Sequence, residues 1–212
     1  MKPILFNTTM VRAILDGRKT VTRRLIKPQP DENADMRFCY AAGRKKDIGK
    51  WTDANERIVS GVCSQQWTPP CCAGDILYVR ETWCDPSGMG YPIFYKADFP
   101  IHYDAEQTEF GEPIDLNADD YAWKPSIHMP KDYARIFLRV TKVRVERLQD
   151  IMDDPPGPNN QVVREGCKYG CDFIALWDST VKYKDIHLYG WDANPFVWVI
   201  EFERINEEEA YE

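Results

Sequence analysis

The alternation of apolar and polar residues between positions 134 and 148 limits the fold more than any other feature of the sequence. Its phase changes partway along: the apolar positions are Ile136, Leu138 and Val140 on one parity, then Val143 and Val145 on the other. Successive side chains of a strand point to opposite faces, so one straight strand cannot bury both sets in the same core. A bulge or corner is therefore predicted near Thr141, and strands that bend in this way are typical of small closed barrels.

The remaining regular segments are short and mixed in kind. Strands are predicted at residues 4–6, 20–24, 76–83, 93–96 and 196–202, and helical segments at 8–16, 162–166 and 172–177. This makes about six short strands and two principal helices without a regular β-α-β order. The pattern favours an α+β domain built on a small, bent β-barrel with flanking helices and long loop insertions.

The length and composition of the chain suit one domain with a sizeable core. The chain has 212 residues, of which 43% are apolar. We expect a single domain over 1–212, with insertions at about 28–73 and 98–120 and an acidic C-terminal tail at 206–212 that frays. No apolar run resembles a signal peptide or a membrane span, which predicts a cytoplasmic protein without membrane contact.

The seven cysteines are irregularly spaced, and we expect them to be reduced thiols. A zinc site is a weaker alternative, because no Cys-x-x-Cys pair is present and only Cys167 and Cys171 have a spacing that could supply half a site. No metal and no cofactor are therefore predicted. The sequence does not define the oligomeric state.

The segment 17–24, Gly-Arg-Lys-Thr-Val-Thr-Arg-Arg, carries most of the polar chemistry. Gly17 ends the preceding helix, and the β-branched residues that follow start a strand in which Thr20 and Thr22 share one face beside Lys19. Residues 1–50 carry a local excess of +7, whereas the whole chain carries −7. Arg18, Arg23 and Arg24 therefore form either a local contact for nucleic acid or a merely solvated basic surface.

Two further segments supply candidate binding residues. Glu81 and Trp83 continue the apolar face of the strand at 76–83, so the carboxylate lies either at the rim of the sheet or in a polar pocket. Trp123, Lys124 and His128 lie in the segment 123–130, which contains two prolines and whose rigidity suits substrate contact. A structural loop with a surface histidine is the competing interpretation of that segment.

The motifs taken together resemble the ASCH family, whose members are PUA-like β-barrels associated with RNA. The motifs are Gly-Arg-Lys-Thr-x-Thr at 17–22, Gly-Asp at 74–75, Glu-Gly at 165–166 and the closing Val-Ile-Glu-Phe at 199–202. Longer segments at 79–83, 123–130, 144–151 and 176–179 are similar to the phage and prophage branch of the family. The resemblance covers most of the chain outside 28–70 and 98–120.

The resemblance also implies a chemistry. One small bacterial member of the superfamily is an amidohydrolase that removes the acetyl group of acetylcytidine without a metal. Its catalytic lysine, threonine and glutamate correspond by motif to Lys19, Thr22 and Glu165. A threonine hydroxyl becomes nucleophilic when a base removes its proton, and a lysine can serve if its surroundings disfavour its charged form. A carboxylate can orient that lysine or protonate the departing amine.

Four hypotheses of function follow from these residues. The first is binding of RNA or a modified nucleoside in a pocket around residues 17–24, with aromatic side chains stacking on bases. The second is deacylation of an acylated cytidine-type nucleoside. The third is a ribonuclease in which His128 is the acid or base. The fourth is a phage accessory protein whose basic strand contacts only protein.

Overall fold

The structure is a computed structural model that describes residues 1–38, 51–53, 66–86, 88, 92–103, 114–157 and 159–211. The chain divides into two compact units, each assembled from segments far apart in the sequence. The first unit comprises Met1–Lys19, Ile76–Arg139 and Glu203–Glu212, and the second comprises Thr20–Asp75 and Val140–Phe202. Parts of both expected insertions, at 39–50, 54–65 and 104–113, lie outside the described residues.

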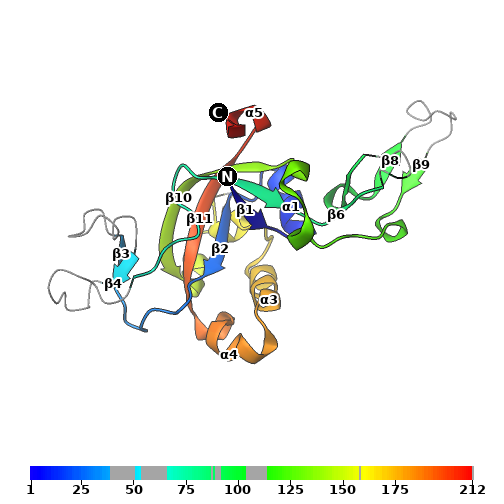
Figure 1. Cartoon of the computed structure of the whole chain (residues 1–212). Coiled ribbons are helices and arrows are strands. Elements are labelled where there is room, and N and C mark those ends of the chain that lie inside the picture. The colour runs from blue at the N-terminus through cyan, green and yellow to red at the C-terminus, as the bar shows by residue number, and fades with distance from the viewer. Residues whose placement is uncertain are drawn as a thin grey trace. The chain divides into compact units, whose positions relative to one another are not determined.

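Five strands are hydrogen-bonded in the order β1-β5-β10-β11-β2 (Figure 1). Their bounds are β1 Lys2–Leu5, β5 Ile76–Arg80, β10 Phe137–Arg147, β11 Phe196–Ile205 and β2 Val21–Leu25. β1 runs parallel to β5, whereas β10 is antiparallel to β5 and β11 is antiparallel to β2. Three further antiparallel pairs are β3 Met36–Phe38 with β4 Trp51–Asp53, β6 Trp83–Cys84 with β7 Phe94–Tyr95, and β8 Ile101–Tyr103 with β9 Ile114–Leu116.

The helices are short and lie between or after these strands. They are α1 Thr8–Leu15, α2 Gln161–Arg164, α3 Gly170–Thr180, α4 Ile186–Tyr189 and α5 Glu207–Tyr211. The chain is therefore a mixed α and β protein, as the sequence predicts, and five of its strands form one sheet. None of the helices in the described ranges is long and apolar enough to cross a bilayer.

In the first unit, α1 begins and ends where the sequence predicts. The side chain of Asn7 accepts a hydrogen bond from the Met10 amide at 2.8 Å, which satisfies one of the free N–H groups of the first turn. Gly17 follows the last turn with a φ of 73°, a left-handed conformation that glycine adopts without steric cost. Val11 and Ile14 are buried on the inner face of the helix.

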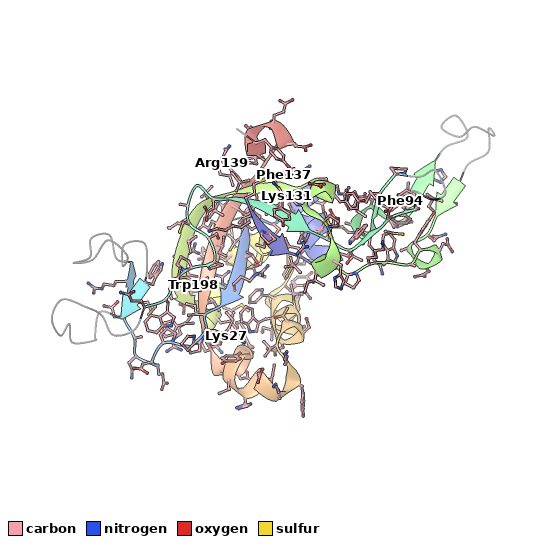
Figure 2. The ribbon with its side chains drawn as sticks, viewed as in Figure 1. Lys27, Phe94, Lys131, Phe137, Arg139 and Trp198 are labelled. Carbon is pink, nitrogen blue, oxygen red and sulfur yellow. The ribbon has the colours of Figure 1, made fainter. Side chains whose placement is uncertain are left out.

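The C-terminal segment of the first unit is folded, so the expectation that it frays was wrong. Asn206 and Glu209 exchange side-chain to backbone hydrogen bonds of 2.7 and 3.2 Å, which start α5. Ala210 is buried in a cluster with Phe137 and Ile205. The Tyr211 ring lies 6.0 Å from the ring of Phe137, which Figure 2 labels, so one apolar turn anchors an otherwise acidic segment.

An aromatic cluster occupies the part of the first unit around β6 and β7. Phe94, labelled in Figure 2, packs edge to face against Phe99 and Tyr121, with ring centroids 5.5 and 5.2 Å away. Trp123 contacts Phe99 at 5.1 Å and donates its indole N–H to the Ala118 carbonyl at 2.6 Å. These contacts fix the segment that leads to Lys124 and His128.

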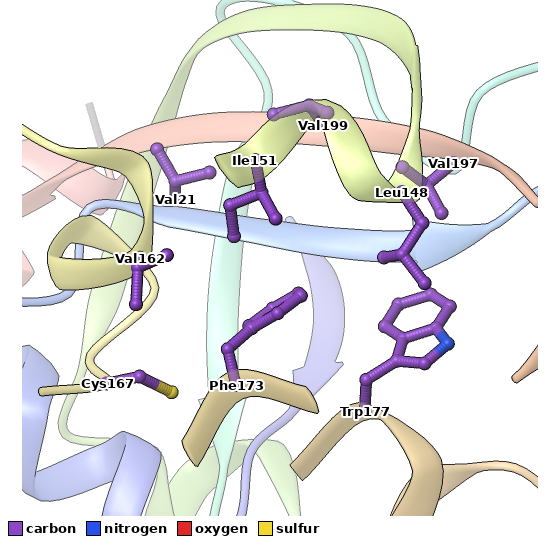
Figure 3. Close-up of a cluster of buried hydrophobic side chains, with 9 residues drawn as sticks. All are labelled: Val21, Leu148, Ile151, Val162, Cys167, Phe173, Trp177, Val197 and Val199. Carbon is purple, nitrogen blue, oxygen red and sulfur yellow. The ribbon is translucent and has the colours of Figure 1, made fainter. Parts of the chain in front are cut away.

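The second unit has its own core between β2, β11 and the helices (Figure 3). Phe173 and Trp177 rise from α3 toward Val197 and Val199 of β11 in Figure 3. The whole cluster consists of Val21, Leu148, Ile151, Val162, Cys167, Phe173, Trp177, Val197 and Val199. Phe173 and Trp177 are both buried, as expected for residues four positions apart on one face of a helix.

The strand β10 is continuous from Phe137 to Arg147, although the sequence predicts a bulge or corner near Thr141. Near Thr141 it is the exposure of the side chains that changes. Leu138 and Val140 are buried, Thr141 is exposed, and the residues after Lys142 are only half-buried. Because neither face of the second half of the strand is fully buried, Val143 and Val145 can point to the face opposite Leu138 and Val140 without a break in the strand.

Candidate functional site

Five polar side chains are buried among the residues that the structure describes, and the sequence singled out all of them as site residues. They are Lys19, Thr22, Arg23, Glu81 and Glu165, each 3% exposed or less. A buried charge costs free energy unless hydrogen bonds and an opposite charge compensate it. The contacts of these five residues therefore define where polar chemistry is concentrated in each unit.

The segment 17–24 is held in place by its backbone. The Lys19 amide donates to the Ala13 carbonyl at 2.9 Å, and the Thr20 amide donates to the Arg164 carbonyl at 2.9 Å. Along β2, Thr22 pairs with Ile200 and Arg23 with Val199 of β11. Val21, Thr22 and Arg23 are buried in β2, whereas Arg18 is exposed, so the segment as a whole is not a solvated surface.

Lys19 and Arg18 differ sharply in exposure. Lys19 belongs to the first unit, is 2% exposed, and its ammonium lies 5.6 Å from the centroid of the Phe6 ring. A cation over an aromatic face gains electrostatic stabilisation that increases as the pair is desolvated. Arg18 is exposed and pairs with the carboxylate of Asp16 at 2.9 Å.

Arg23 of the second unit is the centre of a buried polar network. Its Nη1 donates to Glu165 at 3.2 Å, and its Nη2 donates to Glu146 at 3.1 Å and to the side-chain oxygen of Gln161. Its Nε–H has no hydrogen-bond partner among the residues that the structure describes. A buried donor without an acceptor costs about 1–3 kcal/mol, so this N–H group is a place where an added acceptor stabilises the protein.

A second layer of arginines and carboxylates surrounds Arg23. Arg144 donates to Glu146, to Glu201 and, at 2.9 Å, to Gln161. Arg164 donates to Glu201 at 2.8 Å and to the Thr20 hydroxyl at 3.0 Å. Burial raises the pKa of Glu201, but the hydrogen bond from Arg164 and the positive charge of Arg144 outweigh that effect and lower it below its usual value.

Thr22 and Arg24 form a pair beside this network. Nη1 of Arg24 donates to the Thr22 hydroxyl oxygen at 2.9 Å and to the Arg23 carbonyl at 3.1 Å. Burial lowers the pKa of the Arg24 guanidinium, and the negative charge of Glu165 opposes that shift. Thr22 and Glu165, which the resemblance assigns to catalysis, therefore share neighbouring arginines in one unit.

In the first unit, Glu81 lies in a polar pocket and not at a rim. It is 1% exposed and accepts two hydrogen bonds from Arg135, at 2.9 and 3.0 Å. Arg135 also makes a bidentate pair with Asp98, at 2.8 and 2.9 Å, and stacks 3.9 Å above the Tyr95 ring. Burial raises the pKa of Glu81, and the hydrogen bond and charge of Arg135 offset this only in part.

Trp83 and Lys124 lie together in the first unit. Their backbones exchange hydrogen bonds of 3.2 and 2.7 Å, and the Lys124 ammonium lies 4.5 Å above the Trp83 ring. The buried indole N–H of Trp83 has no partner in the part of the chain that the structure describes. His128 is exposed in a 3-10 turn, Ser126–His128, so the structure places it on the surface.

Metal-ligating side chains do not gather within the described ranges, where no group of three or more His, Cys, Asp or Glu could hold an ion. Cys71, Cys84 and Cys167 are buried free thiols, and Cys72 and Cys171 are exposed free thiols. Cys39 and Cys63 lie outside the described residues.

Sequence reasoning missed most partners of the buried residues. The direct partners that it missed are Arg135, Glu146 and Gln161, and the residues further out in the same networks are Asp98, Arg144, Arg164 and Glu201. A signal was present for some of them: Glu201 interrupts the buried run of the last strand, and Arg144 and Glu146 share one strand face. Opposite charges at such positions indicate a cross-strand network.

Comparisons with known proteins give no family for this chain. No protein-family model matches it, and neither the curated proteins nor the solved structures contain a match. The assignment of function therefore depends on the residues and their geometry.

Proposed function

We propose that this protein is of the ASCH type, with a PUA-like barrel, and binds a modified nucleoside, free or within RNA, at the Arg23 network. The observation that carries the proposal is the Nε–H of Arg23, a buried donor without an acceptor among the described residues. Arg23 is already paired with the carboxylates of Glu146 and Glu165. An uncharged acceptor, such as the carbonyl oxygen of a pyrimidine, therefore completes its hydrogen bonding better than a phosphate does.

The surroundings of Arg23 suit recognition of a base. The Gln161 side-chain oxygen accepts from Arg23, the Thr22 hydroxyl accepts from Arg24, and the Thr20 hydroxyl accepts from Arg164. Such fixed donors and acceptors discriminate strongly, because a ligand that lacks the matching group leaves a buried polar atom without a partner. The resemblance to a family associated with RNA supports the same class of ligand.

Titration calorimetry with acetylcytidine, with cytidine as the reference ligand, tests this proposal. Arg23→Lys keeps a positive charge but removes the Nε–H, and we expect affinity to fall about tenfold or more, the range for one hydrogen bond to a charged group. Arg37→Lys is the matched control, because Arg37 belongs to the same unit and pairs with Asp35 on the surface. Absence of saturable binding by the unmodified protein refutes the proposal.

Arg23→Lys also alters the ion pairs with Glu146 and Glu165, so the stability of the variant is measured alongside its affinity. Circular dichroism at the titration temperature shows whether it is folded, and Thr22→Val supplies a second variant that removes a hydroxyl without a change in size. Binding that survives both substitutions excludes the Arg23 network as the site.

Deacylation is a second candidate function, favoured by the hydrogen bond from Arg24 to the Thr22 oxygen. A guanidinium that donates to a hydroxyl oxygen stabilises the negative charge that develops there when the proton leaves. In this reaction Thr22 bonds to the acetyl carbon, the amide C–N bond breaks, and the amino group of the base takes a proton. Water then cleaves the threonine ester and releases acetate. The resemblance assigns removal of the hydroxyl proton to Lys19 and support of that step to Glu165.

Chromatography of acetylcytidine after incubation with the protein separates binding from deacylation. Turnover that Lys19→Ala and Thr22→Val both abolish supports deacylation. Saturable binding without release of acetate leaves the protein a binding module.

A further inference from the structure

A cavity of about 640 Å³ in the second unit contains none of the buried polar residues described above. Its wall is formed by the segment after β2, the end of β10, the end of α4 and the loop before β11. The lining residues that matter here are Gln29, Glu32, Arg147, Tyr189, Asp192 and Asn194. Ligand sites for small molecules commonly have volumes of about 300–1,000 Å³, so the cavity has room for a nucleotide.

The planar guanidinium of Arg147 forms part of the cavity wall. The carbon centre of its guanidinium lies 3.8 Å from the centroid of the Phe196 ring, which is a stacking distance. Its Nη1 donates to the Asn194 carbonyl at 3.0 Å, and its Nη2 donates to the Glu32 carbonyl. Guanidinium planes held in this way are surfaces on which unpaired bases of RNA stack.

The loop that carries the cavity wall is fixed before any ligand binds. Asn194 has a φ of 44°, and its side-chain oxygen accepts from the Gln149 amide at 2.9 Å. The Gln149 side chain donates to the Trp191 carbonyl at 3.0 Å, and the Trp191 amide donates to Asp178 at 2.8 Å. This loop therefore loses little conformational entropy when a ligand binds.

Tyr189 and Lys27 add an aromatic face and a cation at the same place. The Lys27 ammonium, labelled in Figure 2, lies 4.6 Å above the Tyr189 ring. Lys27 is exposed, whereas Tyr189 is half-buried in the cavity wall. A base next to Tyr189 therefore has a positive charge within reach of its phosphate.

The carboxylates of Glu32 and Asp192 decide which base fits. Both line the cavity and are exposed. A carboxylate accepts hydrogen bonds and repels phosphate, so it selects an edge that presents adjacent N–H donors. Guanine offers two such donors side by side, whereas the single imino N–H of uracil is flanked by two carbonyl oxygens.

We propose that this cavity binds a guanine nucleotide of an RNA strand as a second subsite. The base stacks on Arg147 and Tyr189, a carboxylate accepts from its edge, and its phosphate lies toward Lys27. The inference rests on the proposed function in taking RNA as the ligand, but it uses a separate set of residues.

Titration of guanosine 5′-monophosphate against uridine 5′-monophosphate tests the subsite. We expect the guanosine nucleotide to bind at least about fivefold more tightly, the lower end of the discrimination that a bidentate contact to a base supplies. Asp192→Asn and Glu32→Gln, made together, remove this preference. Asp31→Asn, an exposed neighbour outside the cavity wall, leaves it unchanged.

Equal affinity for the two nucleotides overturns the inference, as does a preference that survives loss of both carboxylates. The two proposals fail separately. Arg23→Lys weakens acetylcytidine binding and leaves the guanosine preference intact, whereas the pair Asp192→Asn and Glu32→Gln does the reverse. If the protein prefers guanosine nucleotides but does not bind acetylcytidine, the result supports the subsite and refutes only the proposed function.

Discussion

Glu201→Gln tests whether the arginine–carboxylate network of the second unit stabilises the fold. Glu201 accepts from Arg164 at 2.8 Å and from Arg144, and its side chain is 19% exposed. A hydrogen bond to a charged group contributes about 1.5–3 kcal/mol, and glutamine keeps one of the two acceptor oxygens. Because these arginines are partly exposed, we expect the free energy of unfolding at pH 7 to fall by about 1.5–2 kcal/mol.

The pH dependence of this loss follows from the lowered pKa of Glu201. A carboxylate whose pKa is lower in the folded state than in the unfolded state stabilises the fold above its unfolded pKa. That stabilisation disappears as pH falls through the folded value. The difference between the unmodified protein and Glu201→Gln is therefore largest at pH 7 and shrinks below the ordinary glutamate pKa of 4.5.

Urea denaturation at a series of pH values measures both effects. Glu203→Gln is the matched control, because Glu203 lies two residues along β11 with its side chain 54% exposed and paired with Arg139. We expect it to cost less than about 0.5 kcal/mol, as surface ion pairs do. A loss from Glu201→Gln that is independent of pH, or no larger than that of the control, refutes the reasoning.

Three other outcomes follow from the structure and can be measured by the same denaturation. The pKa of Glu81 is raised in the folded state, so the stability that Glu81 contributes falls as pH rises above 4.5. The loss of unfolding free energy in Glu81→Gln should therefore be smaller at pH 7 than at pH 4, and a loss that grows with pH contradicts this. Trp83→Phe removes an N–H without a described partner together with part of a buried ring, and should cost about 1–3 kcal/mol from the lost volume alone; a loss above about 4 kcal/mol contradicts an unpaired N–H. Phe173→Ala empties part of the core of the second unit and should cost about 3–5 kcal/mol; a loss below 1 kcal/mol contradicts that packing.

Local rules of the sequence predicted many elements of the fold. The stop at Gly17 was predictable because a glycine that ends a helix acts within a few residues of the last turn. The buried positions of α3 follow from the apolar spacing, since each side chain is placed by the period of the helix. In β11 both faces are buried from Phe196 to Ile200, which matches an apolar run and not an alternation. Expectations failed where distant contacts decide, as at α5, which is anchored by Phe137 from a different part of the chain.

The buried site residues were predictable, but their partners were not. Polar residues inside apolar patterns, such as Arg23 and Glu81, must be compensated, so the sequence indicates that a network exists. It does not indicate that Glu146 and Glu165, more than 120 positions further along the chain, supply the compensation for Arg23. Nor could spacing reveal the cavity at Arg147, because its wall comes from three stretches of chain that carry no shared motif.

The state of the Arg23 Nε–H tests the central claim most directly. A ¹⁵N-resolved NMR spectrum of the arginine Nε–H groups, assigned by loss of one signal in Arg23→Lys, follows this donor during titration with acetylcytidine. Binding at the proposed site gives it an acceptor, so we predict a large change in its shift and slower exchange with water at saturation. A spectrum in which the ligand binds while the Arg23 signal stays unchanged contradicts the proposed site.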